Sequence, residues 1–96
     1  MQLKRRSGIL GLVPTYYFDL YNDMDVIDDE GCDLPDLEAA KAHALAEART
    51  MIEANVAETG KVDLTHRMDV RNESGATVHS LRFEDAVRFV REGKPV

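Results

Sequence analysis

Tyrosine and arginine side chains recur at alternate positions in two segments of the chain. Residues 15–21 and 64–71 each alternate along the sequence, which predicts two strands whose every second side chain shares one face of a sheet. On such a face, tyrosines with arginines can stack on single-stranded bases, and the same residue types make protein–protein hot spots. The candidate binding residues are Tyr17, Tyr21, Arg67, Arg71 and Arg82.

An acidic run at residues 23–31 invites comparison with the calcium-binding loop of an EF-hand. That loop needs oxygen ligands at positions 1, 3 and 5 and a glycine at position 6. Taking Gly31 as position 6 puts Val26 at position 1, and starting from Asp23 puts Ile27 at position 5. The pattern fails, so a plain acidic turn is the preferred interpretation.

Histidine and cysteine offer no complete site either. His66 and His79 fall on strands predicted to be neighbours, diagonal to each other, where two imidazoles could bind zinc, but no third ligand is evident. The lone Cys32 lies in an acidic stretch that disfavours a reactive thiolate, so we expect a small, half-buried residue. The sequence has no Gly-rich phosphate loop, no paired cysteines and no Ser-His-Asp set that can be placed. We therefore predict no metal, no cofactor and no enzymatic activity, with a small metal-dependent enzyme on the acidic hairpin as a third alternative.

The composition is that of one soluble domain. Ninety-six residues suffice for a single modest core, and the net charge of −6 disfavours non-specific nucleic-acid binding. No run approaches the roughly 20 apolar residues that span a bilayer, and the short apolar stretch at residues 9–13 is too short for a signal peptide. With its lone cysteine, the chain is expected to be cytoplasmic. The expected divisions are an extension at residues 1–13, a single domain at residues 14–92 and a tail at residues 93–96.

A long amphipathic helix must support the strands. Residues 37–58 carry apolar side chains at the 3.6-residue period, Asp36 is a suitable N-cap, and Gly60 is suited to end the helix. His43 falls on the predicted outer face, so we expect it to be exposed. Small alanines on the inner stripe would let the helix approach a sheet closely.

Three further elements complete the predicted fold. Residues 26–28 and 76–83 are expected to form the second and fourth strands, and the apolar spacing that starts at Phe83 predicts a short helix over residues 84–91. The order is β-β-α-β-β-α. It predicts an α+β fold of two layers, with a mainly antiparallel four-stranded sheet and the long helix packed on one face. The other face of the sheet is left uncovered.

Five short motifs occur in an order that resembles a family of small uncharacterised bacterial proteins. They are Pro14-x-Tyr16-Tyr17-Phe18-x-Leu20, Asp29-Glu30-Gly31, Leu34-Pro35-Asp36-Leu37-Glu38-Ala39-Ala40, Met68-Asp69-Val70-x-Asn72-Glu73-x-Gly75 and Leu81-x-Phe83-x-x-Ala86. The resemblance covers residues 14–90. The family is a domain of unknown function, so the resemblance implies no activity and no site residues.

These observations favour a non-enzymatic binding or interaction module. We expect it to associate with itself as a dimer, or with a small protein partner, through the open sheet face or an edge strand. The alternative is a single-stranded nucleic-acid or antitoxin-like regulatory protein that uses the same face. The net charge makes nucleic acid the less favoured partner, and no membrane association is expected.

Overall fold

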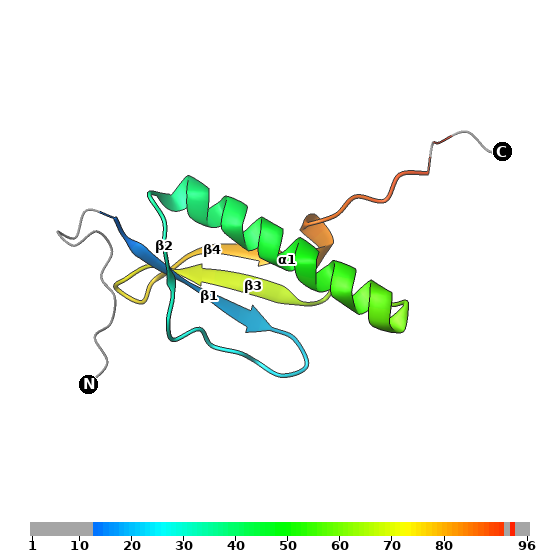
Figure 1. Cartoon of the computed structure of the whole chain (residues 1–96), viewed down its shortest axis with the longest axis horizontal. Helices are drawn as coiled ribbons and strands as arrows, with labels where there is room; N and C mark the ends of the chain where they lie inside the picture. The colour runs from blue at the N-terminus through cyan, green and yellow to red at the C-terminus, as the bar shows by residue number, and fades with distance from the viewer. Residues whose placement is uncertain (1–12, 92, 94–96) are drawn as a thin grey trace.

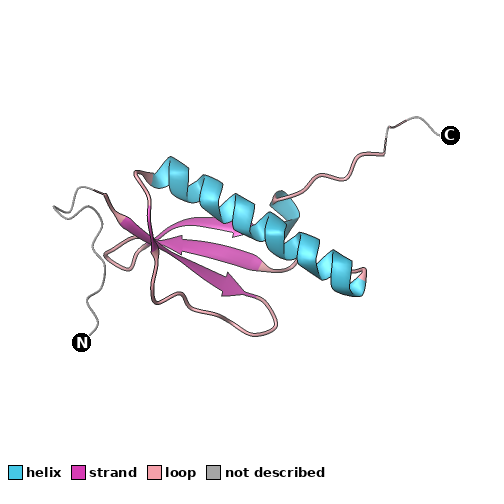
Figure 2. Cartoon of the chain, viewed as in Figure 1, coloured by secondary structure: helices cyan, strands magenta, loops and turns pink. Residues whose placement is uncertain are grey.

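The computed structural model describes residues 13–91 and 93, and shows one helix lying across one face of a four-stranded sheet (Figure 1, Figure 2). The strands are antiparallel to their neighbours and lie in the order β2-β1-β3-β4. The predicted two-layer α+β fold is confirmed. The elements are β1 (Thr15–Tyr21), β2 (Cys32–Asp33), α1 (Leu37–Thr59), β3 (Arg67–Arg71), β4 (Thr77–Arg82) and the 3₁₀ turn η1 (Phe83–Asp85).

Helix α1 begins and ends where the sequence predicts. The side chain of Asp36 accepts a hydrogen bond from the backbone N–H of Ala39 at 2.9 Å, and the N–H of Gly60 donates to the carbonyl of Val56 at 2.8 Å. Both bonds satisfy backbone groups that a helix end leaves unpaired. The predicted stop differs from the observed one by a single residue.

The hydrophobic core lies between α1 and the sheet. Three alanines along one stripe of the helix are fully buried, and because they are small the helix backbone packs close to the strands. The strands contribute alternate side chains from this same face. The buried apolar residues are Tyr16, Ala40, Ala44, Ala48, Met68, Val70, Phe83 and Ala86.

The prediction of a strand at residues 26–28 is wrong. Val26 forms only one isolated bridge, with Leu20, and the second strand is instead Cys32–Asp33, which pairs with the first two residues of β1. Beyond the bridge the loop binds β1 through the side chain of Asp28, which accepts from the N–H of Phe18 at 3.0 Å. A side chain thus replaces the backbone ladder that a strand would have formed. Cys32 is half-buried, as expected.

The predicted C-terminal helix over residues 84–91 is also wrong. Phe83 and Ala86 reach the core, but the helical turn ends there, and Phe89 and Val90 are 73% and 58% exposed. The carbonyl of Ala86, where the turn ends, accepts a hydrogen bond from Nε of Arg49 at 2.8 Å. Short helices depend on packing of an apolar face, and the exposed Phe89 and Val90 provide none for a further helical turn.

Smaller differences concern β3 and His43. The predicted third strand began at residue 64, but Leu64 and Thr65 form a turn and β3 begins at Arg67. His43 was expected to be exposed; it is half-buried because its ring packs on Phe18, with 4.6 Å between ring centroids. The expected extension and tail, including the apolar stretch at residues 9–13, lie almost entirely outside the described residues.

Candidate functional site

The five predicted binding residues all lie on the sheet face opposite α1. In the strand register Tyr17 faces Arg71, while Tyr21 faces Arg67, which in turn faces Arg82 on β4. Residues directly opposite each other in an antiparallel pair project from the same face of the sheet. We call this surface the Tyr–Arg face.

Two arginines of the Tyr–Arg face stack on the tyrosines. The guanidinium carbon of Arg67 lies 4.4 Å from the ring centroid of Tyr21, and that of Arg71 lies 5.0 Å from the ring centroid of Tyr17. Both distances are within the range of a cation–π interaction. The stacks hold the four side chains in fixed positions across β1 and β3.

Two aspartates in the middle of this face were not among the predicted site residues. Asp19 and Asp69 face each other across β1 and β3, and their side chains are only 3% and 13% exposed. Two opposed carboxylates repel each other unless a positive charge lies close to each. The alternation Tyr17-x-Asp19-x-Tyr21 was the available signal, because it puts the aspartate on the tyrosine side of the strand.

Each buried aspartate is paired with an arginine. The Nε and Nη2 atoms of Arg71 donate to the two carboxylate oxygens of Asp19 at 2.6 and 3.1 Å. Nε of Arg67 donates to Asp69 at 2.9 Å, and the hydroxyl of Ser80 donates to the same oxygen at 2.6 Å. The hydrogen bonds to Asp19 and Asp69 raise the pKa of Arg71 and of Arg67, so both guanidinium groups stay charged.

Arg82 lies at the rim of the face rather than in its centre. It is 61% exposed, and its Nη2 lies 3.0 Å from a carboxylate oxygen of Glu84. Each of the three arginines therefore has a carboxylate partner, and the face is close to charge-balanced.

Asp28 joins the Tyr–Arg face to the loop that covers the outer edge of β1. Its N–H donates to Asp19 at 3.0 Å, and its carbonyl accepts from Nη2 of Arg71 at 2.8 Å. Its carboxylate accepts from the N–H groups of Phe18, Glu30 and Gly31. Partial burial raises the pKa of Asp28, but these three N–H groups and the charge of Arg71 outweigh it and lower the pKa below the ordinary value of 3.8.

Gly31 allows this loop to lie against β1. Its φ is +75°, and a Cβ added there would come within 2.6 Å of the Thr15 side chain and 2.9 Å of the Tyr17 ring. A larger residue has neither the backbone conformation nor the space. The short Asp-Glu-Gly motif thus has a structural role in supporting the tyrosine of the face.

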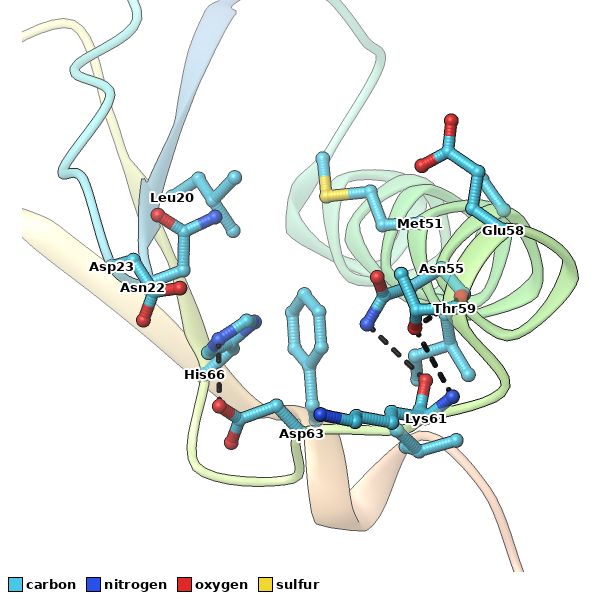
Figure 3. Close-up of a pocket in the computed structure, with 14 residues that line it drawn as sticks. Leu20, Asn22, Asp23, Met51, Asn55, Glu58, Thr59, Lys61, Asp63 and His66 are labelled. Carbon is cyan, nitrogen blue, oxygen red and sulfur yellow. Dashed lines mark hydrogen bonds and ion pairs between the residues drawn. The ribbon is translucent and has the colours of Figure 1, made fainter.

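A cleft of about 740 Å³ lies on the other side of the sheet, between the end of α1 and the loops that follow β1 and precede β3 (Figure 3). Its apolar wall includes Leu20, Met51 and Phe83, and polar groups lie at its rim. His66 lies there with Nε2 at 3.2 Å from Oδ2 of Asp63. Hydrogen bonds from Thr65 are the main reason that the pKa of Asp63 is lowered.

The predicted diagonal arrangement of His66 and His79 is wrong. His79 pairs with Val70 of β3, and His66 lies four residues before Val70, just ahead of the strand. At about 3.3 Å per residue, the two imidazoles are attached roughly 13 Å apart along the strand. They therefore cannot share one metal ion.

A comparison with known protein families finds a match. Residues 15–84 match the family described as Domain of unknown function (DUF6894). The chain belongs to this family. The DUF6894 match includes the whole Tyr–Arg face and ends before the exposed residues Phe89 and Val90.

Two other comparisons find no relative. No curated protein and no solved structure matches the chain. Within the described part of the chain, no helix is long and apolar enough to cross a membrane. The expected resemblance to a domain of unknown function is confirmed at the level of the family.

Proposed function

We propose that the protein is a non-enzymatic binding module that associates with a second copy of itself through the Tyr–Arg face. The observation that supports this proposal is the fixed, charge-balanced arrangement of tyrosines and arginines on the sheet face opposite α1. A cytoplasmic location and a bacterial origin, both expected from the sequence, complete the proposal.

The side chains of the face are held in place before any partner binds. Arg71 is fixed by two hydrogen bonds to Asp19, one to the carbonyl of Asp28, and its stack on Tyr17. Binding normally costs about 0.5–1.5 kcal/mol for each long side chain that becomes ordered. A pre-ordered arginine avoids most of that cost, and tyrosine and arginine are enriched among residues that dominate interface energy.

The charge balance favours a protein partner, and a second copy in particular. Because Arg67, Arg71 and Arg82 each have a carboxylate partner, two copies of the face can approach without strong repulsion between like charges. A two-fold dimer brings the same surface of both subunits together, so a self-complementary mixture of both signs suits it.

The outer edge of β4 is the second surface that could join two copies. The N–H of Phe83 donates to the carbonyl of His66, so its neighbour Arg82 directs its own N–H and carbonyl away from β3. Among the described strands, none pairs with this edge. A second copy could add its own β4 there and extend the sheet.

Three variants distinguish the two surfaces when the molar mass of the full chain is measured by light scattering. If the face is used, Tyr21→Ala weakens the dimer on the order of tenfold or more, as for a hot-spot residue, and Arg82→Ala at the rim weakens it less. If the edge is used, the Tyr21→Ala and Arg82→Ala chains remain dimeric. The Arg82→Pro chain is then monomeric, because proline removes the outward N–H. The φ of −85° at Arg82 is close to the value that proline requires.

Glu53→Ala, on the exposed outer surface of α1, serves as the control and leaves the mass unchanged in either case. A wild-type chain that stays monomeric at all concentrations tested would refute self-association.

A single-stranded nucleic-acid or antitoxin-like regulatory protein is the second candidate. The stacked rings of Tyr17 and Tyr21 favour it, because every base can stack on an aromatic ring. Phosphates would, however, have to compete with Asp19 and Asp69 for the arginines. Binding of labelled oligonucleotides at low salt that Tyr17→Ala abolishes would support this candidate, and no binding to any oligonucleotide would remove it.

A further inference from the structure

We propose that Asp23, Asp63 and His66 form a binding site for a divalent transition-metal ion, with zinc the best match, at the rim of the cleft beside α1. The sequence did not indicate this site, since it draws one residue from the loop after β1 and two from the connection between α1 and β3. The proposal is independent of self-association through the Tyr–Arg face.

The three potential ligand atoms come together from segments far apart in the chain. One carboxylate oxygen of Asp23, one of Asp63 and a ring nitrogen of His66 all lie within 4.8 Å of one another (Figure 3). In a tetrahedral zinc site with bonds of about 2.0–2.2 Å, ligand atoms are roughly 3.3–3.6 Å apart. The 3.2 Å between Asp63 and His66 is already close to that spacing. Asp23 is exposed, so its side chain can rotate to close the set.

The ring nitrogen Nε2 of His66 has an ion-pair neighbour but no well-formed hydrogen bond. Nε2 is buried and makes no hydrogen bond within the described part of the chain, because Oδ2 of Asp63, although only 3.2 Å away, lacks hydrogen-bond geometry. A buried polar atom without a good hydrogen bond destabilises the folded state. Coordination of a cation by Nε2 would remove that cost.

The surroundings hold two of the ligands in place. The rings of His66 and Phe83 meet in a T-shaped contact with 5.5 Å between their centroids, and the carbonyl of His66 accepts from the N–H of Phe83. Oδ1 of Asp63 accepts from both the N–H and the hydroxyl of Thr65, at 3.0 and 2.6 Å, which leaves Oδ2 directed at His66. Ligands that are already fixed lose little freedom when an ion binds.

The donor set determines which ion is expected. Calcium and magnesium prefer six or more oxygen ligands, whereas an imidazole nitrogen favours a transition metal, and zinc accepts both histidine nitrogen and aspartate oxygen as ligands. Three protein ligands leave a fourth position for water or a small molecule in the cleft, whose apolar wall includes Leu20 and Met51.

Titration calorimetry of the full chain with zinc chloride, in a buffer without chelator, tests the proposal. We expect one zinc ion per chain, with affinity reduced at least about tenfold by His66→Gln and by Asp23→Asn, since each removes a direct ligand. Magnesium and calcium at the same concentrations are expected to give no comparable heat. Because Asp23 is exposed, its variant removes a ligand without disturbing the core.

Matched controls separate this site from adventitious binding. His79→Gln and Asp25→Asn change the same residue types outside the cluster, so zinc binding should stay as in the wild type. In a nuclear magnetic resonance titration, zinc should shift the ring signals of His66 and leave those of His79 in place. No zinc binding, or binding that His66→Gln and Asp23→Asn leave unchanged, would overturn the proposal and leave His66–Asp63 as an ion pair alone.

Discussion

At the scale of single residues, Asp28 connects the loop, β1 and the Tyr–Arg face. Its carboxylate accepts from three backbone N–H groups, which favour the ionised form and lower its pKa. A lowered pKa in the folded state means that ionised Asp28 stabilises the protein above the ordinary value of 3.8. This contribution is lost as the pH falls below that value through the lower folded pKa.

We predict that Asp28→Asn lowers the free energy of unfolding at pH 7 by about 1–3 kcal/mol. The side-chain NH₂ of asparagine would face a backbone N–H, and two donors cannot form the hydrogen bond that the carboxylate oxygen now accepts. The variant should also lose less stability than the wild type between pH 5 and pH 3. Urea denaturation at pH 7, 5 and 3 measures both effects. Asp25→Asn, at an exposed position of the same loop, is the control. Equal stability of Asp28→Asn and wild type at pH 7 would contradict the structural role of this carboxylate.

Gly31 and Gly75 offer a comparison between two glycines with positive φ. Gly31→Ala combines an unfavourable backbone conformation with a contact of 2.6 Å to Thr15, whereas nothing lies within 4 Å of a Cβ at Gly75. We predict a loss of about 2–4 kcal/mol for Gly31→Ala and about 1 kcal/mol for Gly75→Ala. Denaturation midpoints measure the difference. Similar losses for both variants would mean that the loop can move away from β1.

At the scale of elements, the C-terminal segment separates into a packed part and an exposed part. Phe83 is 3% exposed in the core and Phe89 is 73% exposed beyond η1. We predict that Phe83→Ala costs about 3–5 kcal/mol and Phe89→Ala less than about 0.5 kcal/mol in the free energy of unfolding. Thermal denaturation of both variants measures this. A large loss for Phe89→Ala would show that this side chain packs against the domain, contrary to its exposed position in the structure.

The elements that could be predicted from sequence are those decided by local interactions. Helix α1 depends on its period, on Asp36 and on Gly60, all of which are near in sequence, and the face of each long strand follows from alternation. The missed elements depend on side chains that bind distant backbone groups. Asp28 binds β1 where a strand was predicted, and Arg49 binds the carbonyl of Ala86, 37 residues away, where the predicted helix stops.

The candidate site shows the same division. Alternation placed Tyr17, Tyr21 and the arginines on one face, but it could not show that Asp19 and Arg71, 52 residues apart, would form an ion pair. That pairing depends on β3 lying beside β1 in one particular register. The cluster of Asp23, Asp63 and His66 depends on the same register and on the position of two loops, so no spacing in the sequence indicates it.

At the scale of the whole molecule, the net charge of −6 opposes the approach of two copies, while the Tyr–Arg face itself is close to neutral. Salt screens repulsion between distant exposed charges more strongly than it weakens the buried pair of Asp19 and Arg71. We therefore predict that raising NaCl from 50 to 500 mM leaves the dimer dissociation constant unchanged or lowers it. Sedimentation equilibrium at several salt concentrations measures this. A nucleic-acid complex would respond in the opposite direction, with a loss on the order of tenfold or more over the same range, because each phosphate contact releases bound counterions. The sign of the salt effect thus distinguishes the proposed dimer from a nucleic-acid complex at the Tyr–Arg face.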